Sequence, residues 1–71
     1  MSKQNGLFQA LLLAEQNGGT VTYHFENGVQ QISNINKEIF TNEKGRRRDL
    51  SDVADILRDN MYDIGATSFM V

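Results

Sequence analysis

A strictly alternating segment followed by Asn-Gly constrains this chain more than any other feature. Apolar and polar side chains alternate through residues 20–26, which is the period of a strand with one buried face. Asn27-Gly28 comes next, and this pair is a strong signal for a tight hairpin turn. A second strand over residues 29–35 would return beside the first, and a two-residue turn would pair Tyr23 with Ile32. The residues expected on the inner face of this antiparallel sheet are Val21, Tyr23, Phe25 and Ile32.

A first helix is predicted before this hairpin. Residues 7–17 are apolar at nearly every position up to residue 14, and Gly18-Gly19 ends the segment. Asn5 can cap this helix, which leaves residues 1–6 as a short flexible tail. One small sheet covers only one side of a helix, so this segment carries more apolar surface than such a sheet can bury.

A second helix is predicted over residues 52–64, with Ser51 as its cap and Gly65 as its end. Its apolar residues recur at spacings of three and four, which places them on one side of the helix. They are Leu50, Val53, Ala54, Leu57, Met61 and Ile64. The short apolar tail over residues 66–71 is expected to add a last strand.

Residues 36–50 allow two interpretations. They could form a second hairpin around a turn at Asn42–Gly45. The isoleucines at positions 32, 35 and 39 also fit helical spacing, and Gly45 could close a short helix. We prefer the hairpin because the residues at positions 39–41 suit a strand.

The predicted elements describe a single small α+β domain over residues 1–71, in the order helix, β-hairpin, second hairpin, helix and short strand. Its sheet is mostly antiparallel, with the helices packed on one face. A chain of this length buries only about 60% of its unfolded surface, so we expect a small stability margin. The residues expected to be mostly buried are Tyr23, Phe25, Ile32, Val53, Leu57 and Met61.

Composition excludes several kinds of chemistry. The chain has no cysteine, so disulfides, thiolate nucleophiles and cysteine-ligated metals are excluded. The single histidine, His24, has no nucleophile or carboxylate pair at a recognisable spacing, which indicates a surface residue rather than a catalytic one. The aspartates at positions 49, 52 and 55 lack the pattern of a calcium-binding loop. We therefore expect no enzyme, no cofactor and no metal site, and the lack of a long apolar run favours a cytoplasmic protein.

Four aspartates recur at spacings of three and four in the second helix. They are Asp52, Asp55, Asp59 and Asp63. At about 100° per residue they lie opposite the apolar residues of the same helix. A row of like charges is unfavourable on a helix, although aspartates near the N-terminus interact well with the helix dipole. The pattern fits either a solvated helix face or a surface for a partner protein with a basic groove.

A basic run lies directly before this helix and consists of Arg46, Arg47 and Arg48, with Lys44 close by. On a strand, Arg46 and Arg48 would share one side and Arg47 would take the other. These residues could contact phosphates, or they could protect an exposed edge strand from aggregation. No aromatic residue interleaves with the run, so it does not indicate a base-stacking platform.

The apolar first helix is a candidate for self-association, unless the second helix and the C-terminal tail cover the rest of its surface. The residues predicted to form this contact are Leu7, Phe8, Leu11 and Leu12. A homodimer would add stability to a chain too small for a large core. The basic run and the acidic helix also make the molecule dipolar, which would allow head-to-tail pairing of copies.

We interpret the chain as a small non-enzymatic protein-binding module. It would be a regulator or inhibitor that occupies a basic surface of a partner protein, such as a nucleic-acid-binding protein, through its acidic helix face. Small acidic proteins without catalytic groups are typical of mobile elements whose products inhibit host enzymes. The alternative is a small nucleic-acid-binding protein that uses Arg46–Arg48, which the net charge of −2 disfavours.

Overall fold

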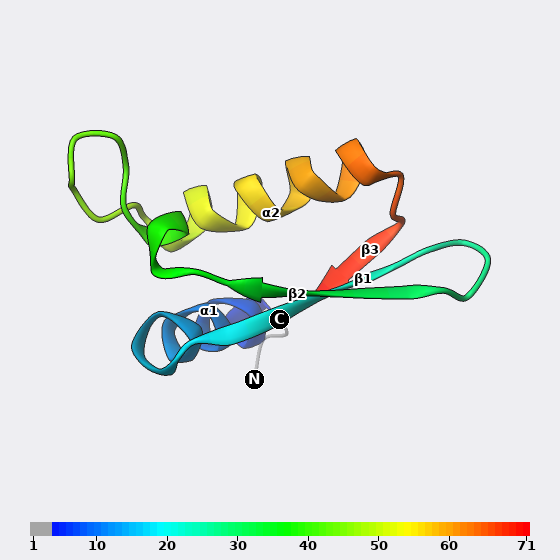
Figure 1. Cartoon of the computed structure of the whole chain (residues 1–71). Helices are drawn as coiled ribbons and strands as arrows, with labels where there is room; N and C mark the ends of the chain where they lie inside the picture. Colours follow the sequence, from blue (N-terminus) through cyan, green and yellow to red (C-terminus); the bar gives the residue numbers. More distant parts are fainter. Residues whose placement is uncertain (1–3) are drawn as a thin grey trace.

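The computed structural model describes residues 4–71, and these form a small α+β domain (Figure 1). The elements in chain order are helix α1 (Gln4–Asn17), strands β1 (Gly19–His24) and β2 (Gln30–Ile35), the 3₁₀ helix η1 (Lys37–Phe40), helix α2 (Leu50–Ile64) and strand β3 (Ser68–Met70). The strands form one antiparallel sheet in the order β2-β1-β3, so β2 and β3 are its edges. Residues 4–6 of the predicted tail belong to α1, which places Asn5 inside the helix rather than at its cap. The rest of that tail lies outside the described residues.

Helix α2 runs along one face of the sheet because its apolar side chains lie on one side (Figure 1). It begins at Leu50, with Asp49 rather than Ser51 at the N-cap position. It ends at Gly65 as predicted, where a φ of +78° suits glycine. Ala66 N–H donates to Met61 O (2.9 Å) across this end, and both residues are buried.

Both helices share one hydrophobic core with the inner face of the sheet. The buried residues are Leu11, Ala14, Val21, Tyr23, Ile35, Phe40, Val53, Ala54, Leu57, Met61 and Ala66. Four of the residues predicted for the core, Tyr23, Val53, Leu57 and Met61, are therefore confirmed. Ile64, which the helical spacing also assigned to the inner side, lies at the margin and is 40% exposed.

The hairpin between β1 and β2 forms where it is predicted, but its register is shifted by one residue. Gly28 N–H donates to Phe25 O (3.0 Å), and Gly28 has a φ of +84°. These features define a three-residue loop, a type I turn followed by a left-handed residue, in place of the predicted two-residue turn. Ile32 therefore pairs with Thr22, and the predicted pairing with Tyr23 is wrong.

The shifted register changes which side of β2 faces the core. Side chains alternate along a strand, so a slip of one residue moves each of them to the opposite face. Ile32, predicted in the core, is 66% exposed, and Ile35 is buried in its place. Phe25 is half-buried and packs against the core from the start of the loop. The face of the sheet turned away from α2 consequently exposes Ile32 and Met70.

The segment between β2 and α2 combines parts of both interpretations. Residues Lys37–Phe40 form the 3₁₀ helix η1, so the first strand of the preferred second hairpin is absent. The turn at Asn42–Gly45 forms as predicted, and it joins a single antiparallel bridge between Thr41 and Arg47. Phe40, the last residue of η1, is buried in the core. Among residues 4–71, no helix is both long and apolar enough to span a membrane.

Candidate protein-binding surface on the second helix

The four predicted aspartates lie along the solvent side of α2. Asp52, Asp55, Asp59 and Asp63 are all exposed. The opposite side of the helix is fixed by Val53 and Leu57, which are buried. The packing of this apolar side therefore orients the carboxylates outward as one row, which we call the acidic face.

The acidic face has little neutralising charge. Arg58 Nη1 donates to Asp55 Oδ1 (2.9 Å), and both side chains are about half exposed or more. In the described part of the chain, Asp52, Asp59 and Asp63 take part in no ion pair. The arginines of the basic run do not pair with this row, so its charge remains available to a partner.

An aromatic side chain that sequence analysis missed lies on the same side of α2. Tyr62 is 67% exposed, and it follows Asp59 by three residues and Asp55 by seven, which places the three on neighbouring turns of one helix side. Exposed tyrosine is enriched at interaction hot spots because its ring is large, rigid and apolar while its hydroxyl is polar. The helical spacing that identified the aspartates contains this signal as well, since Tyr62 falls outside the apolar side.

The basic run is divided by the fold. Arg47 turns toward α1, where its Nε and Nη2 donate to both carboxylate oxygens of Glu15 at 2.9–3.2 Å. The hydrogen bonds to Glu15 and its negative charge raise the pKa of Arg47 above its ordinary value. Arg48 Nη1 donates to the backbone oxygen of Ile39 (3.1 Å) and is partly buried. Two of the three arginines are therefore engaged within the chain.

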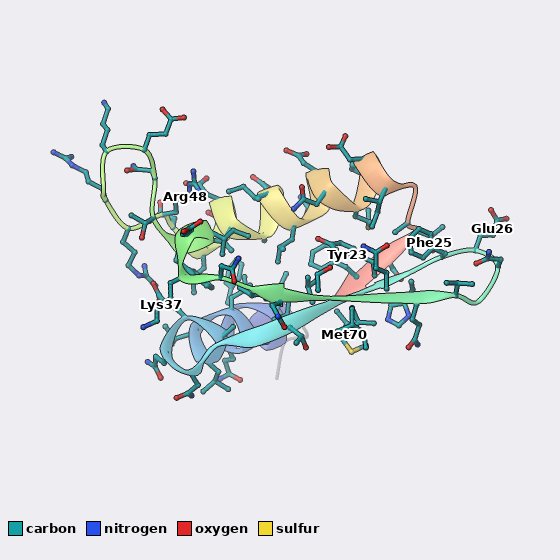
Figure 2. All side chains as sticks on the ribbon, viewed as in Figure 1. Tyr23, Phe25, Glu26, Lys37, Arg48 and Met70 are labelled. Carbon is teal, nitrogen blue, oxygen red and sulfur yellow. The ribbon has the colours of Figure 1, made fainter. Side chains whose placement is uncertain are left out.

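The remaining positive charge lies on a structured loop at the N-terminal end of α2 (Figure 2). The Asn42 side-chain oxygen accepts hydrogen bonds from the backbone N–H groups of Lys44 and Arg46, both at 2.9 Å. Gly45 completes the turn with a φ of +77°. Arg46 and Lys44 are exposed, which leaves a much smaller basic surface than the sequence indicates.

The single histidine, His24, has a side-chain amide as its hydrogen-bond neighbour. His24 is half-buried on β1, and its Nδ1 lies 3.4 Å from the side-chain nitrogen of Gln30. In the part of the chain that the structure describes, no three histidine or acidic side chains are grouped as metal ligands.

The predicted self-association surface on α1 is only partly exposed. Leu11 is fully buried and Leu7 is half-buried against the core. Phe8 and Leu12 remain exposed at 42% and 40%, and Leu13, which was not in the predicted set, is 58% exposed. The burial of Leu11 removes it as a contact residue, because it packs within the same chain.

Comparison of the chain with family models, curated proteins and solved structures gives no match.

Proposed function

We propose that this protein is a small non-enzymatic binding module that occupies a basic surface of a partner protein through the acidic face of α2. The observation that carries this proposal is the exposed row of Asp52, Asp55, Asp59 and Asp63 with Tyr62 beside it. By covering a surface that the partner needs, such a module acts as a regulator or inhibitor.

The charge pattern favours function over stability. Like charges three or four residues apart destabilise a helix by a few tenths of a kcal/mol per pair, so stability alone would favour a mixture of signs. A row of aspartates also accelerates the encounter with a basic partner through long-range attraction. Tyr62 is exposed in the free protein. In a complex its ring would be buried against the partner and would add the apolar contact that charges do not provide.

The fold presents this face in a fixed orientation. Leu57 and Val53 lock the inner side of α2 against the sheet, and Gly65 ends the helix with backbone bonds to Met61 and Tyr62. A preorganised surface loses less conformational entropy on binding. Arg47 and Arg48 are engaged within the chain, and among residues 4–71 neither forms an ion pair with the acidic face.

A native pull-down from host extract, with mass spectrometry and with nuclease present, tests the proposal. The wild-type chain is expected to capture a protein with a basic surface. The variants Asp55→Lys/Asp59→Lys and Tyr62→Ala should lose it while remaining folded, because these side chains point to solvent. The matched control Glu26→Lys/Glu43→Lys makes the same change in net charge at exposed turns outside α2 and its acidic face, and it should retain the partner.

The nucleic-acid interpretation makes the opposite prediction. The reversal Asp55→Lys/Asp59→Lys adds positive charge, so it would tighten binding to a labelled DNA or RNA duplex. Substitution of Arg46, Arg47 and Arg48 by Gln would then abolish the interaction. Capture that depends on these arginines and is indifferent to the acidic face would contradict the proposal.

A further inference from the structure

The edge strand β2 lacks the features that normally protect a sheet edge. Natural edge strands carry charges, proline or bulges, or they are very short. Strand β2 has the sequence QQISNI, with no charge and no proline, and its register with β1 runs without interruption from His24↔Gln30 to Gly19↔Ile35. The other edge, β3, is only three residues long. Strand β2 is therefore the open edge of this sheet.

The free hydrogen-bonding groups of β2 belong to alternate residues. Phe25 N–H donates to Val29 O (2.9 Å) on the β2 side, and His24 O accepts from Thr67 N–H (2.8 Å) on the β3 side. Bonded and non-bonded pairs alternate in an antiparallel ladder, so the odd-numbered residues of β1 and β2 bond to each other. The residues of β2 that direct N–H and C=O groups away from β1 are Gln30, Ile32 and Asn34.

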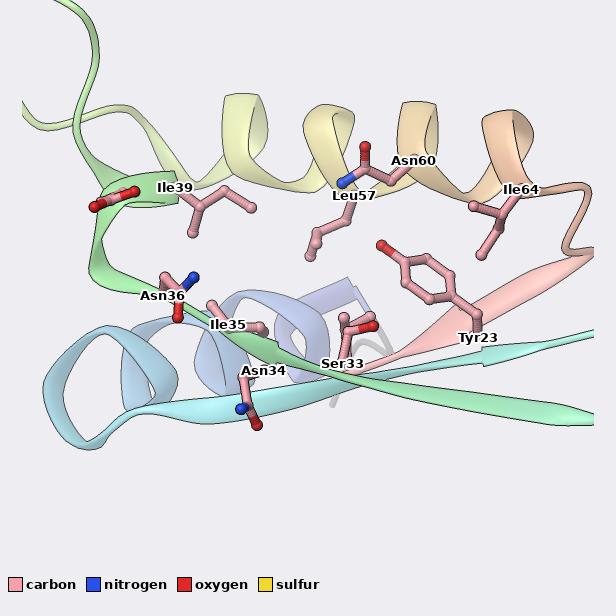
Figure 3. Close-up of a pocket in the computed structure, with 11 residues that line it drawn as sticks. Tyr23, Ser33, Asn34, Ile35, Asn36, Ile39, Leu57, Asn60 and Ile64 are labelled. Carbon is pink, nitrogen blue, oxygen red and sulfur yellow. The ribbon is translucent and has the colours of Figure 1, made fainter.

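A groove borders this edge on the side of the core (Figure 3). It lies between β2 and α2 and has a volume of about 480 Å³. Tyr23 and Leu57 line its apolar part, and Ser33 and Asn60 line it from β2 and α2. An open strand edge beside a groove under a helix is the geometry in which an added strand is bound by backbone hydrogen bonds.

We propose that β2 pairs antiparallel with β2 of a second copy of this chain, centred on Ile32, to form one continuous six-stranded sheet. In this register Ile32 faces Ile32, and Gln30 faces Asn34 of the second copy. All three are outward-bonding residues, so each pair can exchange two backbone hydrogen bonds. The strand is thus its own complement: the apolar residue meets an apolar residue, and amides meet amides.

The charges at the two ends of β2 select the antiparallel arrangement. Glu26 lies in the turn before the strand and Lys37 follows it, and both are exposed at opposite ends of the sheet (Figure 2). A two-fold axis at Ile32 brings Glu26 of each copy to the end that carries Lys37 of the other. A parallel pairing would instead place like charges together. Glu38, the other charge near this end, belongs to η1 and lines the groove.

The second copy also fits the groove. The register centred on Ile32 places Gln31 of the second copy beside Ser33, where its amide can reach the polar rim that Asn60 provides. The acidic face of α2 points away from the core and stays exposed in this dimer. The interface is small, so we expect weak association with a dissociation constant of about 10–100 µM.

Sedimentation over about 1–500 µM protein tests this pairing. The wild-type chain should shift from monomer to dimer. Ile32→Lys should weaken association at least about tenfold, because it sets two like charges opposite each other. The matched control Met70→Lys changes an equally exposed residue of the same sheet face on the opposite edge strand, at 65% against 66% exposure, and it should dimerise like the wild type. Thermal melts confirm that each variant is folded.

Disulfide trapping reports the register directly, since the chain contains no cysteine. In Ile32→Cys the two Cα atoms would lie about 5.5 Å apart, within disulfide range. This variant should oxidise to a covalent dimer, and Met70→Cys should not. A wild-type chain that stays monomeric throughout the concentration series overturns the proposal. Equal loss of dimer in Met70→Lys or in Leu12→Lys also overturns it, because association would then use the sheet face or α1.

Discussion

Helix α2 is apolar on one side and acidic on the other, whereas α1 carries large apolar side chains on both. The spacing in α2 predicted its four buried residues and its exposed aspartates, and the structure confirms them. It also assigned Ile64 to the inner side, and this residue is 40% exposed. In α1, Leu11 is fully buried while Leu12 and Leu13 next to it are exposed. The difference shows that an amphipathic pattern determines how a helix faces a sheet, and that a uniformly apolar helix leaves this choice to packing.

Two contacts of α1 accompany its orientation. Ala14 lies so close to β1 that a Cβ atom on Gly19 would be 3.0 Å from the Ala14 Cβ atom, so only glycine permits this approach without displacement. Glu15, one residue further, holds Arg47 through paired hydrogen bonds. Both contacts occur in the orientation that turns the side of α1 with Leu11 toward the core.

The largest expected effect is on the two buried leucines. Leu11→Ala and Leu57→Ala should each lower the free energy of unfolding by about 2–5 kcal/mol, because both side chains are almost completely buried. Leu12→Ala should cost less than about 1 kcal/mol at a site that is 40% exposed. Urea unfolding measures all three. Equal losses for Leu11→Ala and Leu12→Ala would show that α1 is rotated from the orientation described.

The glycines that end the two helices give the next effect. Gly18 and Gly65 have φ values of +75° and +78°, and nothing lies within 4 Å of a Cβ atom at either position. Alanine at either position should therefore lower the free energy of unfolding by about 1–2 kcal/mol, because the backbone conformation alone is unfavourable for it. Gly6 lies inside α1 and has equally open space. Gly6→Ala should leave the free energy of unfolding unchanged or raise it. Thermal unfolding of all three alanine variants measures these effects.

The ion pair between Glu15 and Arg47 is expected to contribute less than either glycine. The Arg47 side chain is half exposed and that of Glu15 is partly buried, so solvent still screens much of their attraction. A double-mutant cycle with Glu15→Gln and Arg47→Gln should therefore give a small coupling energy. The pair raises the pKa of Arg47, so the contribution of this cation is present below the ordinary arginine pKa and lost only at strongly alkaline pH. A coupling energy that changes between mildly acidic and mildly alkaline buffer would contradict this assignment.

The smallest effect, with the opposite sign, is expected on the acidic face. Asp59→Asn removes repulsion along α2 without breaking the pair between Arg58 and Asp55. The free energy of unfolding should rise by a few tenths of a kcal/mol, detectable as a slight increase in Tm. A clear loss of stability would mean that Asp59 makes a structural contribution, and the acidic face would then need no partner to explain it.

The parts of the fold that follow from local patterns were predictable from the sequence. Helix α2, its end at Gly65, the hairpin and the short last strand depend on spacing and on turn residues that act locally. The register of β2 was not predictable in this way, because Asn27-Gly28 fits both a two-residue and a three-residue loop. Only packing decides between them, and it buries Ile35 rather than Ile32.

The candidate site was predictable in part for the same reason. The exposure of the aspartates follows from helical spacing. The hydrogen-bond partners of the arginines are instead residues distant in sequence. Arg47 meets Glu15, 32 positions earlier, and Arg48 reaches the backbone of η1. Tyr62 was not predicted because it belongs neither to the apolar side of α2 nor to its charged residues.

The rate at which the captured partner associates tests the central claim about the acidic face most directly. Stopped-flow association at low and at physiological salt would compare the wild-type chain, Asp55→Lys/Asp59→Lys and the control Glu26→Lys/Glu43→Lys. Electrostatic steering can raise an association rate by about tenfold or more, and salt screens it. The account predicts that the reversal on α2 slows association at least about tenfold and removes its salt dependence, while the control changes it little. Association that is equally fast in the α2 reversal and the wild type, with the same salt dependence, would contradict the account.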